Sequence, residues 1–410
     1  MRIVFAIPRY WPAVSSSGSI LDHICRYCNQ SSPHTARILT AQWEEHWPTE
    51  LTVREVSVTR FPLQSWGLLP RKTLGGRIAD WLQQHRDQWD LLVIVGNIEG
   101  GEELFSTAKR LKKPCVIHVM ETGAATVWED AEIQRRHHKR LQQWYRQPHW
   151  IVPDLPMKSR VQRQHSTTEV DIWNLGMDYH ESDGQLPNET KLALTSAHPI
   201  LRGSRFVPIL VFDGSYDIPE TTQWLWQLVR NVFRNRADLR IWLCGDGPGL
   251  MNLYHAVNAD GLEDLVLFPG YFSSKEDLYR AADLVLLPEC GRHTSYDLMT
   301  AASVGTPVLH AGQPPIQQVV GSASLGHSIP VPEQGSFASR SVPAEVALAV
   351  QDMYPTGQVT EWVSAIFRFL DEPEAWETRF HWVADTLSDK LPRDSTLEEY
   401  FQLLTRIGES

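Results

Sequence analysis

LRIWLCGDGPG, residues 239–249, is an apolar run that ends directly in a glycine turn. Such a run is typical of a buried parallel strand. Farther along the chain, DLYRAADLVLLPE (277–289) predicts a helix that leads into a second strand, and TPVLHAG (306–312) predicts a third. Strands that alternate with helices indicate βαβ units, because parallel strands need a crossover connection. This region therefore predicts a parallel sheet covered by helices.

The same alternation occurs on both sides of a polar segment, residues 171–191, whose Gly, Pro, Asn and Asp residues predict a linker. After the linker, VPILVF (207–212) predicts a strand and TTQWLWQLVRNVFRN (221–235) an amphipathic helix. Before it, we expect a helix from about Ile20 and strands at 2–7, 89–96, 114–120 and 149–154. The pattern predicts an α/β protein with two Rossmann-like doubly wound domains. We place these domains at 1–185 and 186–388, followed by a C-terminal helical segment, 389–410, that we expect to pack back across the domains.

The composition agrees with two globular domains. The chain has 410 residues, of which 42% are hydrophobic and 21% are charged. Its net charge of -11 disfavours non-specific binding to nucleic acid, so we expect no nucleic-acid partner. Tryptophan occurs 16 times. Indole faces are frequent in sugar sites, but they are also good core residues, so the count alone does not identify a ligand.

The compartment and the metal content are also expectations from sequence. The N-terminal MRIVFAIPRYWP lacks the long apolar core of a secretory signal, and no run reaches about 18 apolar residues, so we expect a cytoplasmic protein. Cys25 and Cys28 lie in a helix-like stretch without a second pair at zinc spacing, which favours a structural role and no metal. A basic cluster could touch an anionic membrane or form a solvated face; its members are Arg135, Arg136, His137, His138, Lys139 and Arg140.

Two loops are candidates for chemistry. The glycine turn, with Gly245, Asp246 and Gly247, could bring backbone N–H groups to a phosphate, or it could be only a tight turn between strand and helix. The second loop follows the strand within 283–287, at the carboxyl end where open α/β sheets bind ligands. Its polar residues are Glu289, Arg292, His293, Thr294, Ser295 and Asp297. Arg292 and His293 could hold a diphosphate, and the carboxylates could take sugar hydroxyls, although capping residues of a surface loop would look similar.

The order of these segments resembles that of the GT-B fold glycosyltransferases, in particular the retaining, nucleotide-sugar-dependent group 1 enzymes. The matching segments are RYWPAVSSSGS (9–19), IWNLGMD (172–178), GDGP (245–248), LVLFPGYF (265–272), DLYRAADLVLLPE (277–289) and AASVGTPVLHAG (301–312). The resemblance implies two facing domains with a cleft between them. It implies that a nucleoside-diphosphate sugar binds to the second domain, that an acceptor glycan or lipid is the partner, and that no further cofactor is needed.

The resemblance also implies roles for particular residues. The family carries two Glu with seven residues between them, and their places here are Arg292 and Thr300. Glu289 and Asp297 form a pair with the same spacing, three positions upstream, and are the alternative acids. In the first domain Glu121 or His118 stands near the family's His, and Ser16, Ser17 and Gly18 replace its glycine loop. Ser215 stands near the place of a phosphate-binding Arg.

Three functions stay open at this point. The first is an active glycosyltransferase of polysaccharide biosynthesis, in the cytoplasm or peripheral at the inner face of the membrane. The second is a GT-B-like binding or scaffold protein without chemistry that partners an active transferase; the missing acids favour it. The third is another enzyme on the same fold, a nucleotide-sugar epimerase or a phosphorylase. Fold alone does not separate these functions, since one fold hosts many chemistries.

Overall fold

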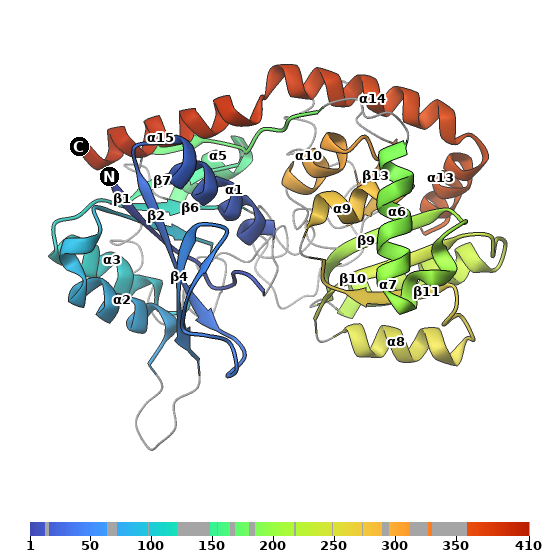
Figure 1. The fold of residues 1–410 in the computed structure, drawn as a ribbon, viewed down its shortest axis with the longest axis horizontal. Helices are drawn as coiled ribbons and strands as arrows, with labels where there is room; N and C mark the ends of the chain where they lie inside the picture. The colour runs from blue at the N-terminus through green and yellow to red at the C-terminus, as the bar shows by residue number, and fades with distance from the viewer. Residues whose placement is uncertain are drawn as a thin grey trace. The chain divides into compact units, whose positions relative to one another are not determined.

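A computed structural model gives the fold, and Figure 1 shows it as a ribbon. The residues that it describes are 1–12, 16–63, 72–96, 98–120, 148–153, 155–164, 169–179, 185–216, 219–247, 249–272, 274–288, 295–311, 327–329 and 359–409. They divide into two compact units. Unit 1 contains Met1–Leu175 and Asp394–Ser410, and unit 2 contains Gly176–Arg393.

Unit 1 is built on an eight-stranded sheet with the order β3-β4-β2-β1-β5-β6-β7-β8. Its strands are β1 (Arg2–Ala6), β2 (Thr35–Gln42), β3 (Glu50–Val53), β4 (Val56–Pro62), β5 (Leu91–Val95), β6 (Cys115–His118), β7 (His149–Val152) and β8 (Val170–Ile172). All neighbours are parallel except β3, which runs antiparallel to β4. The chain moves outward from β1 through β2 to β4 and then returns to the other side of β1 as β5. The strand order therefore reverses between β1 and β5.

Helices cover the unit 1 sheet because its strands are apolar on both faces. The helices are α1 (Ser16–Ser31), α2 (Leu74–Gln84), η1 (Arg86–Gln88), α3 (Gly101–Arg110), α5 (Leu155–Gln164) and α15 (Arg393–Glu409). Helices α2 and α3 bury Ile78, Leu82 and Leu104 against Leu92 and Ile94 of β5. Figure 1 shows these two helices on one side of the sheet and α1 and α15 on the other. Continuous apolar strands of this kind are the pattern expected for a parallel sheet.

Unit 2 has a six-stranded sheet with the order β11-β10-β9-β12-β13-β14, in which every neighbouring pair is parallel. Its strands are β9 (Ile209–Ser215), β10 (Arg240–Asp246), β11 (Val266–Gly270), β12 (Leu284–Leu287), β13 (Val308–Ala311) and β14 (His327–Ile329). The strand order reverses between β9 and β12. At such a reversal an open α/β sheet leaves a crevice outside the carboxyl ends of its strands, and ligands bind there.

Two apolar layers hold the helices of unit 2 to its sheet. The helices are α6 (Gln185–Ala197), η2 (Pro199–Ser204), α7 (Pro219–Phe233), α8 (Leu250–Ala259), α9 (Lys275–Arg280), α10 (Ser295–Ser303), α13 (Val359–Asp371) and α14 (Pro373–Lys390). On one face Leu210 and Phe212 of β9 pack with α7 and α13. On the other face Ile209 and Val211 pack with α9 and α10. The alternation along β9 is the period of two that a strand imposes on its side chains.

The structure corrects three expectations from sequence. Helix α1 begins at Ser16 instead of near Ile20, because the small residues 16–18 continue the helix rather than form a loop. The predicted linker 171–191 contains the end of β8 and the first half of α6, since Val170–Ile172 pair with β7 despite their short run. Strands β2 and β4, which we had not assigned, lie beside β1 and extend the sheet.

Candidate functional site

The predicted glycine turn begins at the carboxyl edge of the unit 2 sheet, which is the edge where its parallel strands end. Ser215 is the last residue of β9, Asp246 is the last of β10, and the segment 289–294 follows β12. The reversal of strand order between β9 and β12 lies at the same edge. The ends of β9 and β10 therefore lie at the edge where open α/β sheets bind ligands.

Several predicted site residues lie outside the described residues, and their arrangement is not part of the structure. They are Glu121, Glu289, Arg292, His293 and Thr294, together with the basic residues Arg135, Arg136, Lys139 and Arg140. The backbone of Ser16, Ser215 and Asp246 is described, but their side chains are not.

The glycine turn is tied closely to the loop after β9. Gly245 has a φ of 104°, and a Cβ atom there would lie 1.9 Å from the carbonyl oxygen of Gly214. A Cβ on Gly247 would lie 2.6 Å from the backbone nitrogen of Tyr216. The backbone N–H of Gly249 donates to the carbonyl of Tyr216 at 2.8 Å. The glycines are thus required for tight packing between two loops, whether or not their N–H groups also meet a phosphate.

A buried ionic cluster lies beneath the same edge. Lys275, at the start of α9, has its Nζ atom 2.7 Å from Oδ1 of Asp297 and 3.1 Å from Oδ2 of Asp213. The hydroxyl of Tyr279 donates to Oδ1 of Asp297 at 3.4 Å. The side chain of Asp297 is 0% exposed, and those of Lys275 and Asp213 are almost fully covered. Strand β9 and helices α9 and α10 each contribute one charged residue, so the cluster connects three elements. We call Asp213, Lys275 and Asp297 the ionic cluster.

The carboxylates of the ionic cluster stabilise the charged form of Lys275. Burial alone would lower the pKa of Lys275, but the carboxylates of Asp213 and Asp297 raise it well above its ordinary value. Lys275 is therefore protonated at neutral pH. Asp297 was predicted from the sequence as an alternative catalytic acid, whereas Asp213 and Lys275 were not predicted. A signal was present for Asp213, since it is the one charged residue of the strand 209–215 and directly follows the apolar run 209–212.

Thr300, at one of the two places where the resemblance puts a Glu, is buried within α10. Asp297 lies one turn earlier on the same helix, and its carboxylate points to Lys275. Within the part of the chain that is described, α10 therefore presents its acid to the ionic cluster. A stabilising contact accounts for this geometry without any contact to a substrate.

His118, the predicted catalytic histidine of the first domain, is a core residue of unit 1. Its Nδ1 atom lies 2.9 Å from the hydroxyl oxygen of Tyr400 in α15. Its ring lies edge-on to Trp173, with ring centroids 5.5 Å apart, and Trp173 donates its indole N–H to the carbonyl of Thr396 at 2.7 Å. Burial lowers the pKa of His118 to about 3, so the imidazole is neutral at physiological pH. We call His118, Trp173 and Tyr400 the aromatic cluster.

The predicted N-terminal loop is the first turn of α1, which follows β1. Ser17 and Gly18 are in helical conformation. This turn belongs to the side of the unit 1 sheet at which β1 ends, and a helix N-terminus favours an anion. The helix also holds Cys25 and Cys28, which are buried and unlinked.

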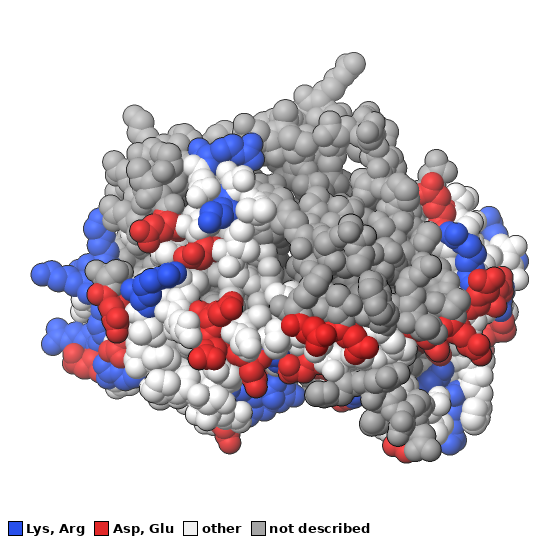
Figure 2. All heavy atoms as spheres, turned by 90° about the horizontal axis from the view of Figure 1, so that it is seen from above, with Lys and Arg blue, Asp and Glu red and all other residues white. Residues whose placement is uncertain are grey.

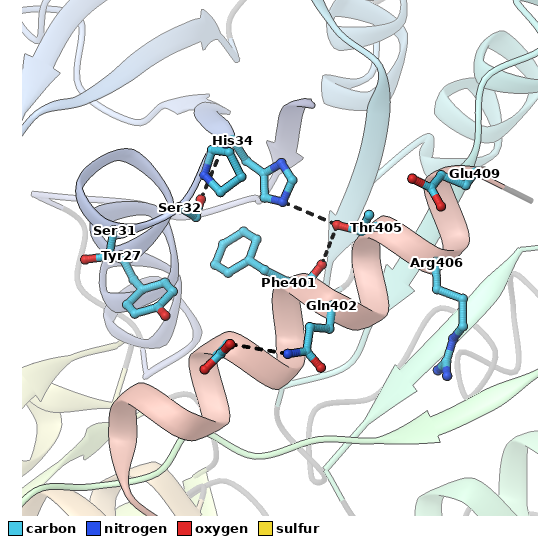
Figure 3. Close-up of a pocket in the computed structure, with 11 residues that line it drawn as sticks. Tyr27, Ser31, Ser32, His34, Phe401, Gln402, Thr405, Arg406 and Glu409 are labelled. Carbon is cyan, nitrogen blue, oxygen red and sulfur yellow. Dashed lines mark hydrogen bonds between the residues drawn. The ribbon is translucent and has the colours of Figure 1, made fainter.

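A groove of about 670 Å³ opens at the opposite edge of unit 1. It lies between the end of α1, the segment that leads into β2, and α15. Figure 3 shows the rings of Tyr27, His34 and Phe401 along it, with Arg406 and Glu409 at one end. Tyr27 and Phe401 stack with ring centroids 5.9 Å apart. None of the predicted site residues lines this groove.

Neither the distribution of surface charge nor the described metal-ligating residues identify a further site. Figure 2 shows acidic and basic side chains interspersed over the described part of one face. Among the described residues, no helix is long and apolar enough to cross a membrane. The described residues also contain no group of three or more His, Cys, Asp or Glu with metal-ligating geometry.

Comparison with solved structures defines the class of the fold. HepE of Anabaena in complex with UDP and glucose is 13% identical, with a TM-score of 0.69, and the match covers 99% of this chain and 100% of that chain. Sucrose-phosphate synthase of Thermosynechococcus elongatus is 14% identical, with a TM-score of 0.68 over 99% and 98%. WaaG, a glycosyltransferase involved in lipopolysaccharide biosynthesis, is 17% identical, with a TM-score of 0.65 over 96% and 98%. The chain therefore has the GT-B glycosyltransferase fold, as predicted.

The match to a sequence family is confined to unit 2. Residues 207–354 match the family described as Glycosyl transferases group 1, which confirms the resemblance drawn from the sequence over this segment. No curated protein matches the chain. The matched segment runs from the start of β9 past β14, so it contains the glycine turn, the ionic cluster and the loop 289–294.

Proposed function

We propose that this protein is a glycosyltransferase that moves a sugar from a nucleoside-diphosphate sugar to an acceptor glycan or lipid. The observation that carries the proposal is the family match of residues 207–354, which contains the predicted donor loops. UDP is the favoured nucleotide, because HepE, which shares the fold, is described in complex with UDP-glucose. We propose no cofactor beyond this donor.

In this proposal the donor lies at the carboxyl edge of the unit 2 sheet. The N–H groups of Gly245, Asp246 and Gly247 and the side chains of Arg292 and His293 face its diphosphate, with Thr294 and Ser215 as further partners. The bond between the anomeric carbon and the diphosphate oxygen breaks, and the acceptor oxygen forms the new bond. The leaving diphosphate gains negative charge, so positive groups and N–H donors stabilise the transition state. The proton of the acceptor hydroxyl has to pass to a carboxylate or to the leaving diphosphate.

We propose two acidic residues for the active site, one on the donor side and one on the acceptor side. Glu289, in the loop after β12, fixes hydroxyls of the donor sugar. Glu121, which follows β6, is the acid on the acceptor side. His118 and Asp297 act on the site through packing, because His118 bonds to Tyr400 and Asp297 pairs with Lys275. The basic cluster at Arg135, Arg136, Lys139 and Arg140 is proposed to contact an anionic membrane surface, from the cytoplasmic side.

Calorimetric titration of the purified protein with UDP, GDP, ADP and dTDP tests the donor site. We expect micromolar binding of UDP. Arg292→Ala should weaken that binding by about 1.5–3 kcal/mol, the range for a charge-assisted hydrogen bond. Arg234→Ala is the matched control, because Arg234 is exposed and follows α7 at the opposite edge of the sheet. Equal affinity of the two variants would remove Arg292 from the site.

A second candidate function is a GT-B binding or scaffold protein without chemistry. The replacement of both expected Glu residues, by Arg292 and Thr300, favours it. The two functions differ in the fate of UDP-sugars. An enzyme should release UDP from a UDP-sugar when a suitable acceptor is present, whereas a scaffold protein should bind UDP and leave the sugar attached. Mass spectrometry of the nucleotide after incubation distinguishes them.

A further inference from the structure

Two neighbouring loops of unit 1 carry exposed aromatic side chains at the carboxyl edge of its sheet. Arg9 and Trp11 follow β1, and Trp43 follows β2. The two strands are parallel neighbours, and the bond from Ile7 N–H to the carbonyl of Leu39 extends their ladder. Both loops therefore leave the sheet on the same side. Because β1 also lies where the strand order reverses, this is the edge at which a ligand of unit 1 is expected.

The exposure of these tryptophans is unusual for this protein. Trp11 is 41% exposed and Trp43 is 42% exposed. Every other tryptophan whose side chain is described is buried or half-buried. An exposed indole keeps a large apolar surface in water, and two of them on adjacent loops are the mark of a binding surface rather than of a core. We call Arg9, Trp11 and Trp43 the tryptophan platform.

Hydrogen bonds from a buried arginine in the sheet fix the backbone of the platform. Arg60 in β4 is only 2% exposed, and its guanidinium donates to the carbonyl of Trp11 at 2.7 Å and to that of Pro48 at 2.8 Å. One buried side chain thus joins the loop after β1 to the loop after β2. The indole N–H of Trp43 donates to the carbonyl of Pro8 at 3.0 Å, which ties the loops a second time. A surface held in this way loses little entropy when a ligand binds.

One cationic side chain contacts the platform, and two exposed carboxylates lie in the same loop as Trp43. The guanidinium of Arg9 lies 4.6 Å from the ring centroid of Trp43. Arg9 is exposed, so a ligand can reach its guanidinium. Glu44 and Glu45 are exposed in the same loop as Trp43 and supply acceptors. Flat apolar faces flanked by charged donors and acceptors suit a sugar ring, which has an apolar C–H face and a rim of hydroxyl groups.

We propose that the tryptophan platform binds a sugar ring of the acceptor, and that the acceptor is therefore a carbohydrate or a carbohydrate-bearing lipid. The inference rests on the proposed glycosyltransferase function. The C–H face of the sugar packs on Trp11 and on the side of Trp43 away from Arg9. Hydroxyls of the sugar accept hydrogen bonds from Arg9 and donate to Glu44 or Glu45.

An array of immobilised neutral and acidic oligosaccharides, probed with fluorescently labelled protein in the presence of UDP, tests the proposal. We expect Trp11→Leu and Trp43→Leu each to weaken oligosaccharide binding by roughly tenfold, the loss of one good stacking contact. Trp11→Phe and Trp43→Phe keep an aromatic face and should retain most of the binding. Trp226→Leu is the matched control. Trp226 is partly exposed, and the guanidinium of Arg230 lies 5.6 Å from its ring centroid.

The outcomes separate this proposal from the proposed function. UDP titration of each variant shows whether the donor site is intact. Wild-type protein that binds UDP but none of the oligosaccharides would overturn the tryptophan platform, and so would Leu variants that bind as tightly as Trp226→Leu. Tryptophan-dependent oligosaccharide binding in a protein that fails to bind UDP would leave the platform in place and overturn the transferase proposal instead.

Discussion

The ionic cluster of unit 2 and the aromatic cluster of unit 1 occupy similar positions but use opposite chemistry. Each involves a residue close to the carboxyl end of an inner strand of its sheet, and each connects that strand to at least one helix. In unit 2 the residue is Asp213, and the connection is made by charges at 2.7 and 3.1 Å. In unit 1 it is His118, and the connection is made by a neutral hydrogen bond of 2.9 Å and by ring packing.

The two clusters differ in the charge that each places close to the carboxyl edge of its sheet, where ligands are expected to bind. The ionic cluster places two carboxyl groups and one ammonium group next to one another near the carboxyl end of β9. In the proposed donor site, the positive groups that meet the diphosphate are Arg292 and His293, together with backbone N–H groups. The aromatic cluster contains no charged group. At the carboxyl edge of unit 1, the exposed indoles of Trp11 and Trp43 provide apolar surface.

Removal of Lys275 should have the largest effect on stability. Lys275→Met removes the ammonium group that the carboxylates of Asp213 and Asp297 share, and breaking a buried ion pair costs about 3–5 kcal/mol. Urea denaturation measures the free energy of unfolding. The exposed Lys109→Met is the control and should change the free energy by less than about 0.5 kcal/mol. A loss below about 1 kcal/mol for Lys275→Met would mean that the ionic cluster does not hold α9 and α10 to the sheet.

Asp297→Asn should have a smaller effect, because the amide oxygen can still accept a hydrogen bond from Lys275. Only the charge of the pair is lost, and we expect a decrease of about 1.5–3 kcal/mol in the free energy of unfolding. The same variant distinguishes structure from catalysis. If Asp297 acts only through packing, turnover at a temperature where the variant is fully folded should stay near that of the wild type. Lost turnover in a variant of unchanged stability would identify Asp297 as the catalytic acid of the shifted pair.

The two clusters also show which features of the structure could be predicted from the sequence and which could not. Apolar strands ending in turns were sufficient to predict the α/β fold, since their pattern is local and repeats in both halves of the chain. The partners of the candidate residues were not predictable. Tyr400, which bonds to His118, is 282 residues away along the chain, and Asp213 meets Lys275 only because α9 packs on β9. Position at a strand end was enough to single out candidate residues, but it could not tell a buried packing residue such as Asp297 from one that faces a ligand.

Acid should weaken unit 1 through His118. Unfolded histidine has a pKa of about 6.5, whereas burial lowers that of folded His118 to about 3. The unfolded state therefore takes up a proton first as the pH falls, and stability is lost between about pH 6.5 and pH 3. The slope should reach about 1.4 kcal/mol per pH unit. Urea denaturation at pH 7, 6 and 5 should show this slope for the wild type and not for His118→Gln. Parallel profiles for the two proteins would contradict a neutral, buried His118.

A matched pair of tyrosine variants gives the smallest and sharpest comparison. Tyr400→Phe removes the partner of the His118 ring nitrogen, which is buried and lies 2.9 Å from the lost hydroxyl. Tyr279→Phe removes a hydroxyl 3.4 Å from Asp297, whose carboxylate keeps its shorter contact with Lys275. We expect a loss of about 1–1.5 kcal/mol for Tyr400→Phe and about 0.5 kcal/mol for Tyr279→Phe, because an unsatisfied buried group costs more than a weak second contact. Urea denaturation of both variants tests the order. The reverse order would mean that the Tyr279 hydroxyl, rather than Lys275, carries much of the compensation for Asp297.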